Sequence, residues 1–279
     1  MVDFRSFAEG TLNGGHLACV GLDSAYERIP ECIRNGRSPG DAVIVFNREI
    51  VAATHDLVDG FKPNLAFYFA LYTLGINGAE VLKKTVENIR DINPRVPIVL
   101  DAKYGDIGNT NEGYAKFAFD YLGVDAVTVH PYLGKEALGP FLTRKDKGAI
   151  VLCRTSNHGA PEFQDLLIPG NEPLYRRVAR NVAEQWNTHG NCALVVGATY
   201  PDELAEVRKI VGDMPILVPG IGEQGGDLPK TVIAGLNSRN QGMMINSSRG
   251  IIFASDGTDF AEAARRATQV LCDGVNACR

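Results

Sequence analysis

The stretch VLDAKYGDIGNTN, residues 99–111, indicates a buried strand that brings charged groups to a surface. An apolar run ends abruptly in the spacing Asp-x-Lys-x-x-Asp, and glycine and small polar residues follow, as in a loop. Side chains two apart on a strand share a face, so Asp101 and Lys103 are expected to point the same way, with Asp106 beyond the strand end. An isolated pattern of this kind is more often a solvated strand end, so its meaning depends on the rest of the chain.

Short apolar runs that close in polar or glycine residues occur about eight times. They span residues 17–22, 57–62, 97–101, 126–129, 149–153, 193–197, 216–218 and 243–246. Segments with helical periodicity lie between them, for example 79–90, 173–186, 201–211 and 260–271. Strands that alternate with helices indicate parallel pairing through right-handed crossovers. About eight such units in 279 residues favour a (β/α)₈ TIM barrel over a doubly wound sheet, with residues 1–279 as a single domain.

Composition narrows the class of protein. Hydrophobic residues make up 45% of the chain and charged residues 22%, with a net charge of -5, which gives no reason to expect nucleic acid or an anionic membrane as a partner. The six cysteines are scattered without the spacing of a zinc site, and they suit buried thiols in a reducing compartment. Residues 1–9 are amphipathic and carry acids, unlike a signal peptide, and no apolar run approaches the roughly 18 residues of a membrane span. A cytoplasmic protein is expected.

Enzymes with this type of barrel place their active sites at the carboxyl ends of the strands. The predicted strand ends carry, in chain order, Asp23, Lys62, Asp101, Lys103, Asp106, His130, Ser156, Gln224 and Arg249. The glycine-rich turn at 220–226 lets backbone N–H groups approach an anion, and Arg249 on the next strand offers a planar fork for phosphate. We therefore expect a phosphorylated substrate, with a merely flexible loop as the alternative.

The charged residues at the second and third strand ends form the other half of the predicted site. Neighbouring strands lie about 4.8 Å apart, so Lys62 would adjoin Asp101 and Lys103. Interleaved carboxylates keep lysines protonated, which suits a proton donor rather than a Schiff-base nucleophile. Asp101 and Asp106 could instead hold Mg²⁺, but a lysine between them would neutralise that site. A single histidine such as His130 is more often structural than a metal ligand, so no metal is expected.

In the spacing D-x-K-x-x-D-I-x-x-T, which begins at Asp101 and ends at Thr110, the chain resembles the orotidine 5′-phosphate decarboxylase family. Asp23, Lys62, the glycine-rich loop with Gln224, and Arg249 follow in the family's order, so the resemblance covers nearly the whole chain. The length and the segment CRTSN at 153–157 are most similar to the longer bacterial subfamily.

The resemblance implies decarboxylation of orotidine 5′-phosphate to uridine 5′-phosphate, the last step of de novo UMP biosynthesis, without a metal or cofactor. Lys62, Asp101, Lys103 and Asp106 would form the charged network, with Lys103 delivering the proton to pyrimidine C6. The implied substrate contacts are ribose to Asp23 and Lys62, pyrimidine to Ser156, and phosphate to Gly222, Gln224 and Arg249. Asp106 and Thr110 would reach the partner's site in a homodimer. His158-Gly159 departs from the family pattern, which leaves the contacts of the Ser156 loop open.

Two other functions remain possible on the sequence alone. A metal-dependent decarboxylase of a sugar phosphate, such as ketogulonate phosphate, shares the D-x-K-x-x-D pattern and would lose activity with a chelator. A non-catalytic nucleotide-binding regulator would keep the pocket and bind uridine monophosphate without consuming orotidine monophosphate. The intact Lys103 weighs against the regulator.

Overall fold

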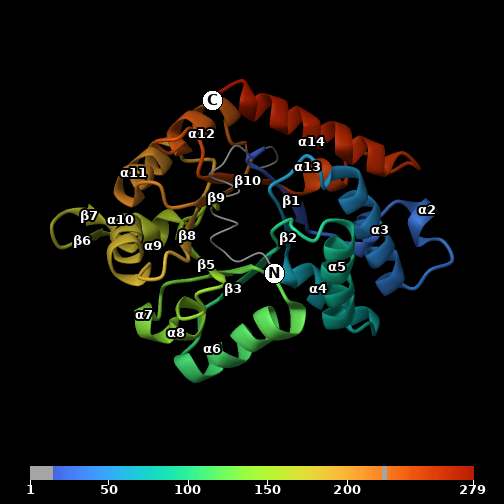
Figure 1. The fold of residues 1–279 in the computed structure, drawn as a ribbon, viewed down its shortest axis with the longest axis horizontal. Helices are drawn as coiled ribbons and strands as arrows, with labels where there is room; N and C mark the ends of the chain where they lie inside the picture. Colours follow the sequence, from blue (N-terminus) through green and yellow to red (C-terminus); the bar gives the residue numbers. More distant parts are fainter. Residues whose placement is uncertain (1–14, 222–224) are drawn as a thin grey trace.

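Eight parallel strands surrounded by helices form a barrel in the computed structural model, which describes residues 15–221 and 225–279 (Figure 1). The barrel strands are β1 (Ala18–Leu22), β2 (Gly60–Pro63), β3 (Val99–Tyr104), β4 (Ala126–Val129), β5 (Gly148–Arg154), β8 (Cys192–Val196), β9 (Ile216–Pro219) and β10 (Met243–Ser247). They pair in the order β2-β1-β10-β9-β8-β5-β4-β3. Parallel bridges from Phe61 to Ile98 and from Asn64 to Asp101 join β2 to β3. These bridges close the sheet, so the predicted (β/α)₈ barrel is confirmed.

The helices form the outer layer and follow the strands in alternation (Figure 1). The longer ones are α3 (Pro39–Thr54), α5 (Gly78–Ile92), α6 (Gly108–Ala115), α10 (Leu174–Asn181), α11 (Pro201–Val211), α12 (Leu228–Gly235) and α14 (Phe260–Asn276). Shorter pieces are η1 (Tyr26–Arg28), α2 (Glu31–Arg34), α4 (Leu65–Ala70), η2 (Leu71–Leu74), α7 (Gly134–Ala137), α8 (Gly139–Leu142), α9 (Pro161–Gln164) and α13 (Arg249–Ile252). Two π-helical segments, η3 (Lys116–Leu122) and η4 (Val182–Trp186), continue α6 and α10. A small antiparallel hairpin pairs β6 (Leu167–Ile168) with β7 (Glu172–Pro173).

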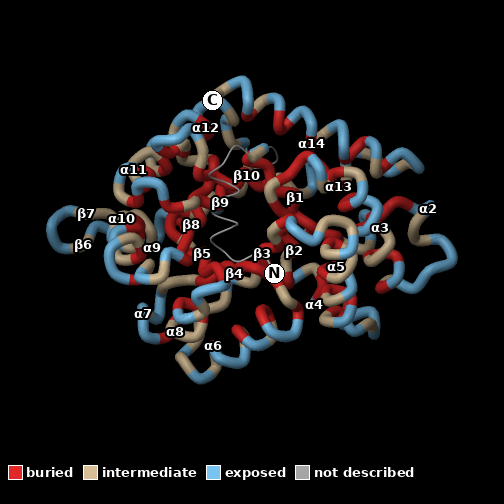
Figure 2. The backbone as a smooth tube through the Cα atoms, in the orientation of Figure 1, coloured by how far each residue is buried: buried red, intermediate tan, exposed pale blue. Residues whose placement is uncertain are grey.

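Apart from the carboxyl half of β3, the strands are almost entirely buried on both faces, which explains their apolar sequences (Figure 2). Side chains on the outward faces join the large cluster packed under the helices. A separate cluster fills the barrel interior and consists of Cys19, Val99, Ala126, Ile150, Ala193, Val195, Leu217 and Met244. On β3, β4 and β10 the cluster residue lies two positions before Asp101, Thr128 and Asn246, so the apolar cluster lies beneath these polar residues.

The predicted helices match the observed ones closely where capping signals were present. The helix predicted over 201–211 is α11, with Pro201 at its first position. The helix predicted over 260–271 is five residues longer, because α14 runs to Asn276. The third strand also extends further than predicted, to Tyr104, through an irregular segment described below. The β6–β7 hairpin was not predicted, since its two-residue strands carry no periodicity.

All six cysteines are unpaired, and the predicted burial holds for four of them, whereas Cys32 is exposed and Cys278 is partly buried. Burial raises the pKa of the Cys19 and Cys153 thiols to about 12, so both stay protonated. Within the described ranges, no helix has both the length and the apolar character required to cross a membrane.

Candidate active site

A cavity of about 440 Å³ opens at the carboxyl ends of the barrel strands. It is lined by six of the predicted site residues: Asp23, Lys62, Asp101, Lys103, Ser156 and Arg249. Asp106 and Thr110 are not among the described residues that line it. Gly222 and Gln224 lie outside the described residues. The volume is suited to a ligand of nucleotide size.

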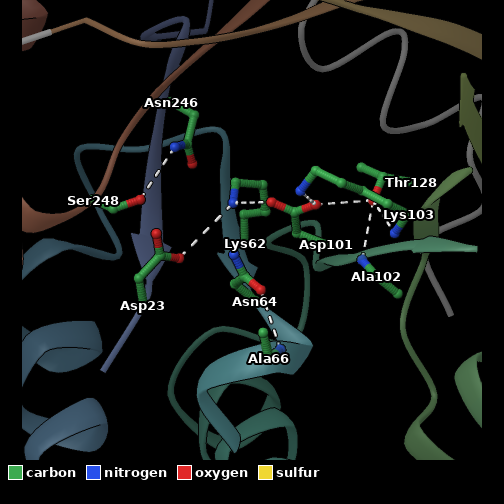
Figure 3. A network of polar contacts seen from close by, with 10 residues as sticks. All are labelled: Asp23, Lys62, Asn64, Ala66, Asp101, Ala102, Lys103, Thr128, Asn246 and Ser248. Carbon is green, nitrogen blue, oxygen red and sulfur yellow. Dashed lines mark hydrogen bonds and ion pairs between the residues drawn. The ribbon is translucent and has the colours of Figure 1, made fainter. Parts of the chain in front are cut away.

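The carboxylate of Asp101 lies between two lysine ammonium groups (Figure 3). Lys62 Nζ is 2.8 Å from Asp101 Oδ2, and Lys103 Nζ is 2.6 Å from Asp101 Oδ1. Lys62 Nζ also lies 3.9 Å from Asp23 Oδ1. Strands β1, β2 and β3 are adjacent in the closed barrel, which is why residues far apart in the sequence meet here.

Asp23, Lys62, Asp101 and Lys103 together form the lysine network. Its two lysines differ sharply in exposure. The Lys62 side chain is 4% exposed and the Lys103 side chain is 50% exposed. Burial alone would lower the pKa of the Lys62 ammonium, but the carboxylates of Asp101 and Asp23 outweigh burial and raise that pKa above its usual value. Burial would likewise raise the pKa of Asp101, but Lys62 and Lys103 outweigh it and hold that pKa well below its usual range. Lys62 and Asp101 therefore both stay ionised at neutral pH.

Several polar residues that line the cavity were not among the predicted site residues, including Thr128 in β4 and Asn246 in β10. Thr128 Oγ1 donates to Asp101 Oδ1 at 3.0 Å, and Asn246 Nδ2 donates to Ser248 Oγ at 3.2 Å. Each stands at an inward position near the end of an otherwise apolar strand, and that position was the available signal. Lys103 departs from the simple strand alternation used to predict it, because its φ of 51° is in the left-handed region.

The loop that follows β5 brings Ser156 to the cavity. Thr155 N donates to Gln164 Oε1 at 2.8 Å, which ties this loop to α9. Gly197, after β8, has no side chain to block it: a Cβ there would lie 2.7 Å from Ser156 Cβ and 2.8 Å from Ser156 N. The missing side chain at Gly197 is therefore what lets the Ser156 loop lie against the end of β8.

The predicted phosphate end of the cavity is formed by the segments after β9 and β10. Ile221 and Gly226 form an isolated bridge, and Gly226 N donates to Gly220 O at 3.3 Å. A Cβ at Gly226 would lie only 2.9 Å from that carbonyl, so the close approach requires glycine. Arg249 opens α13 and lines the cavity beside Ser248. The structure thus brings Arg249 to the same cavity as the lysine network.

Asp106 and Thr110 lie on the loop and helix that leave β3. Asp106 Oδ1 accepts the Ile107 N–H at 2.7 Å, and Asn111 Nδ2 donates to the carbonyls of Asp106 and Ala137. The Asn111 contacts tie this loop to α7, which follows His130. His130 packs over Gly105, where a Cβ would fall 2.3 Å from its Nε2. In the part of the chain that the structure describes, no cluster of three His, Cys, Asp or Glu residues could hold a metal ion.

Residues 18–266 match the model of the family described as "Orotidine 5'-phosphate decarboxylase / HUMPS family". The chain is 45% identical over 269 residues to an orotidine 5′-phosphate decarboxylase from Cellvibrio japonicus, with 96% of each chain covered. The structure of Leishmania donovani OMP decarboxylase matches with a TM-score of 0.82 and 34% identity, over 99% of this chain and 98% of that one. Leishmania donovani UMP synthase matches with a TM-score of 0.86 and 36% identity; the match covers all of this chain but 57% of that longer one.

Proposed function

This chain belongs to the orotidine 5′-phosphate decarboxylase family and is a decarboxylase of UMP biosynthesis, and we propose that its lysine network does the chemistry without a metal ion or cofactor. The observation that carries the proposal is the position of Lys103. Its ammonium lies on the cavity wall, half exposed, with Asp101 2.6 Å away on the buried side. A lysine held in this way can present a proton to a ligand in the cavity.

In the proposed reaction, the bond between C6 of the pyrimidine and its carboxylate breaks and CO₂ leaves. The electron pair stays on C6, and the Lys103 ammonium supplies the proton that forms the new C6–H bond. Water then returns a proton to Lys103. The main task of the site is to stabilise developing negative charge at C6, and fixed ammonium groups do this without reorganisation during the step. Lys62 and Asp101 hold Lys103 in place for this task.

Residues at different strand ends would bind the ribose, the pyrimidine and the phosphate of the substrate. Asp23 Oδ1 is buried and accepts no hydrogen bond from the described residues, so it can accept one from a ribose hydroxyl, with Lys62 beside it. Ser156 would contact the pyrimidine. Arg249, with Gly222 and Gln224, would bind the phosphate, which lies far from the reacting carbon. Phosphate binding of this kind can contribute to catalysis when it fixes the orientation of the substrate.

We further propose a homodimer in which Asp106 and Thr110 serve the partner's site. Their absence from the described lining of their own cavity supports this arrangement. Three large apolar side chains are exposed on the adjoining loops: Ile107 at 56%, Tyr132 at 82% and Leu133 at 43%. Mixing two inactive variants, Lys103→Ala and Asp106→Asn, should restore about a quarter of wild-type activity, because one of the two sites in each mixed dimer is intact. No recovery in a mixture shown to exchange subunits would contradict the shared site.

We propose that this protein is located in the cytoplasm, a reducing compartment. Six unpaired cysteines, four of them buried, support the proposal, since thiols persist where disulfides are kept reduced. Fractionation of cells that express the full chain tests it, and recovery outside the cytoplasm would contradict it.

The decisive experiment follows the ultraviolet absorbance of orotidine monophosphate in the presence of EDTA. We expect the absorbance to fall at the same rate with and without the chelator, and Lys103→Ala serves as the inactive control. Activity lost with EDTA and restored by Mg²⁺ would indicate a metal-dependent reaction instead. Binding of uridine monophosphate without any consumption of orotidine monophosphate would indicate a nucleotide-binding regulator.

A further inference from the structure

We propose that Thr128 is a positioning residue for the decarboxylation, because its hydroxyl fixes both the Asp101 carboxylate and the backbone that aims Lys103 at the cavity. The inference rests on the proposed role of Lys103 as the proton donor. It concerns a residue of β4 that touches the network through side-chain and backbone hydrogen bonds.

The pairing of β3 with β4 shifts register between Leu100 and Tyr104. Leu100 pairs with Val127 and Tyr104 with Val129, so the three residues 101–103 lie opposite Thr128 alone. Within this segment Lys103 has φ 51°, a conformation that a non-glycine residue keeps only when its surroundings hold it. The bulge takes the N–H groups of Ala102 and Lys103 out of the regular ladder, so both need another acceptor.

Thr128 Oγ1 provides that acceptor. It accepts the N–H of Ala102 and the N–H of Lys103, each at 3.0 Å. The same hydroxyl donates its own proton to Asp101 Oδ1 at 3.0 Å (Figure 3). A threonine hydroxyl offers one donor and two acceptor positions, so all three are used.

The contacts of this one hydroxyl connect the backbone and side chains of the network. Asp101 Oδ1, which accepts from Thr128, also accepts from Lys103 Nζ at 2.6 Å, while Asp101 Oδ2 accepts from Lys62 Nζ at 2.8 Å. Thr128 therefore contacts Lys103 at its backbone and, through Asp101, at its ammonium. Only 1% of Thr128 is exposed, so bulk water does not readily replace the hydroxyl.

Thr128 is in β4, which β5 and β8 separate from β9 and β10, the strands followed by the residues proposed to bind phosphate. Its loss should therefore impair the chemical step more than binding. Thr128→Val keeps the branched shape but removes the hydroxyl, leaving two N–H groups and one carboxylate position without their partner. We expect kcat to fall about 10- to 100-fold, with the Kd for uridine monophosphate unchanged within about threefold.

Thr128→Ser is the matched control, because it keeps the hydroxyl and loses only a methyl group. It should retain kcat within about fivefold of wild type. If Thr128→Val fails to fold, the kcat values of Thr128→Ser and Thr128→Ala are compared instead, because these two variants differ by a single oxygen. A purely structural role would lower the melting temperature and the active fraction in proportion to lost volume, without rescue by the hydroxyl.

Equal kcat in the Val variant and in wild type would overturn the inference, as would equal kcat in the Ser and Ala variants. Failure of the proposed function gives a different result. In that case wild-type protein would not decarboxylate orotidine monophosphate, or Lys103→Ala would turn over normally. Measuring wild type, Lys103→Ala and the Thr128 series in one assay separates the two failures.

Discussion

Two clusters at the carboxyl ends of the barrel strands each place a buried cation beside a carboxylate. In the lysine network the Lys62 side chain is 4% exposed and faces Asp101. In the second cluster, at the end of β5, the Arg154 side chain is 1% exposed and faces Asp165 at 2.8 Å. By charge and burial alone the two clusters look alike.

They differ in what remains available to a ligand. The Arg154 guanidinium donates to Thr155 O at 2.8 Å, pairs with Asp165, and lies 3.9 Å from the centre of the Tyr200 ring. A guanidinium does not release its proton, and Arg154 does not line the cavity, so this cluster can only hold the loop after β5. The lysine network instead ends in a half-exposed ammonium on the cavity wall. A charged group that is exposed to the cavity, rather than the burial of the cluster as a whole, therefore distinguishes the cluster suited to chemistry.

The largest effect should come from Lys103→Ala, which removes that exposed end. We expect kcat to fall by about 10⁴-fold, since both the proposed proton donor and a fixed charge are lost. The Kd for uridine monophosphate should stay measurable, and the melting temperature should change little because half of the side chain is exposed. Near-normal turnover would show that the Lys103 ammonium does not distinguish the lysine network from the Arg154 cluster.

Arg154→Met should show the opposite pattern, with stability lost and chemistry largely kept. It removes a buried cation and leaves its partners without a donor, so we expect the free energy of unfolding to fall by about 3 kcal/mol in urea titrations. The kcat of the folded fraction should stay within about tenfold. Arg154→Lys keeps the charge but not the fork, and it should recover less than half of the lost stability. A loss of kcat like that of Lys103→Ala would assign the second cluster to catalysis.

Most of the barrel could be predicted from the sequence because strands buried on both faces form apolar runs. The strand ends also revealed Lys62, Asp101 and Arg249. The role of Thr128 could not be predicted, because threonine is common in strands and the bulge opposite it depends on the pairing of β3 with β4. Arg154 belongs to the segment CRTSN singled out in the sequence, but its contacts could not be predicted, because only the fold brings Asp165 and Tyr200 to it.

Arg249→Ala tests the same contrast within one residue type, because Arg249 carries a guanidinium like Arg154 but lines the cavity. If position rather than residue type decides the role, this variant should lose binding instead of stability. We expect KM for orotidine monophosphate to rise about 30-fold, as for the loss of charge-assisted hydrogen bonds to phosphate. The free energy of unfolding should stay within about 1 kcal/mol. An unchanged KM would remove Arg249 from the phosphate site.

The smallest effect concerns Asp101 and the pH dependence of stability. Lys62 and Lys103 outweigh burial and hold the pKa of Asp101 well below its usual range, whereas an aspartate in the unfolded chain titrates near pH 3.9. As the pH falls below about 4, the unfolded chain takes up a proton at this position and the folded chain does not. The stability that Asp101 contributes is therefore present above that pH and is lost as the pH falls towards its folded pKa.

Asp101→Asn cannot titrate, so its free energy of unfolding should fall less steeply with acid than that of wild type. In urea titrations between pH 5 and pH 3, the slopes of unfolding free energy against pH should differ by up to about 1.4 kcal/mol per pH unit, which corresponds to one proton. Above pH 5 the two curves should run parallel, since Asp101 is ionised in both states of the wild type. Parallel curves down to pH 3 would mean that the carboxylate between the two lysines does not couple their charge to folding, although the structure places it in contact with both.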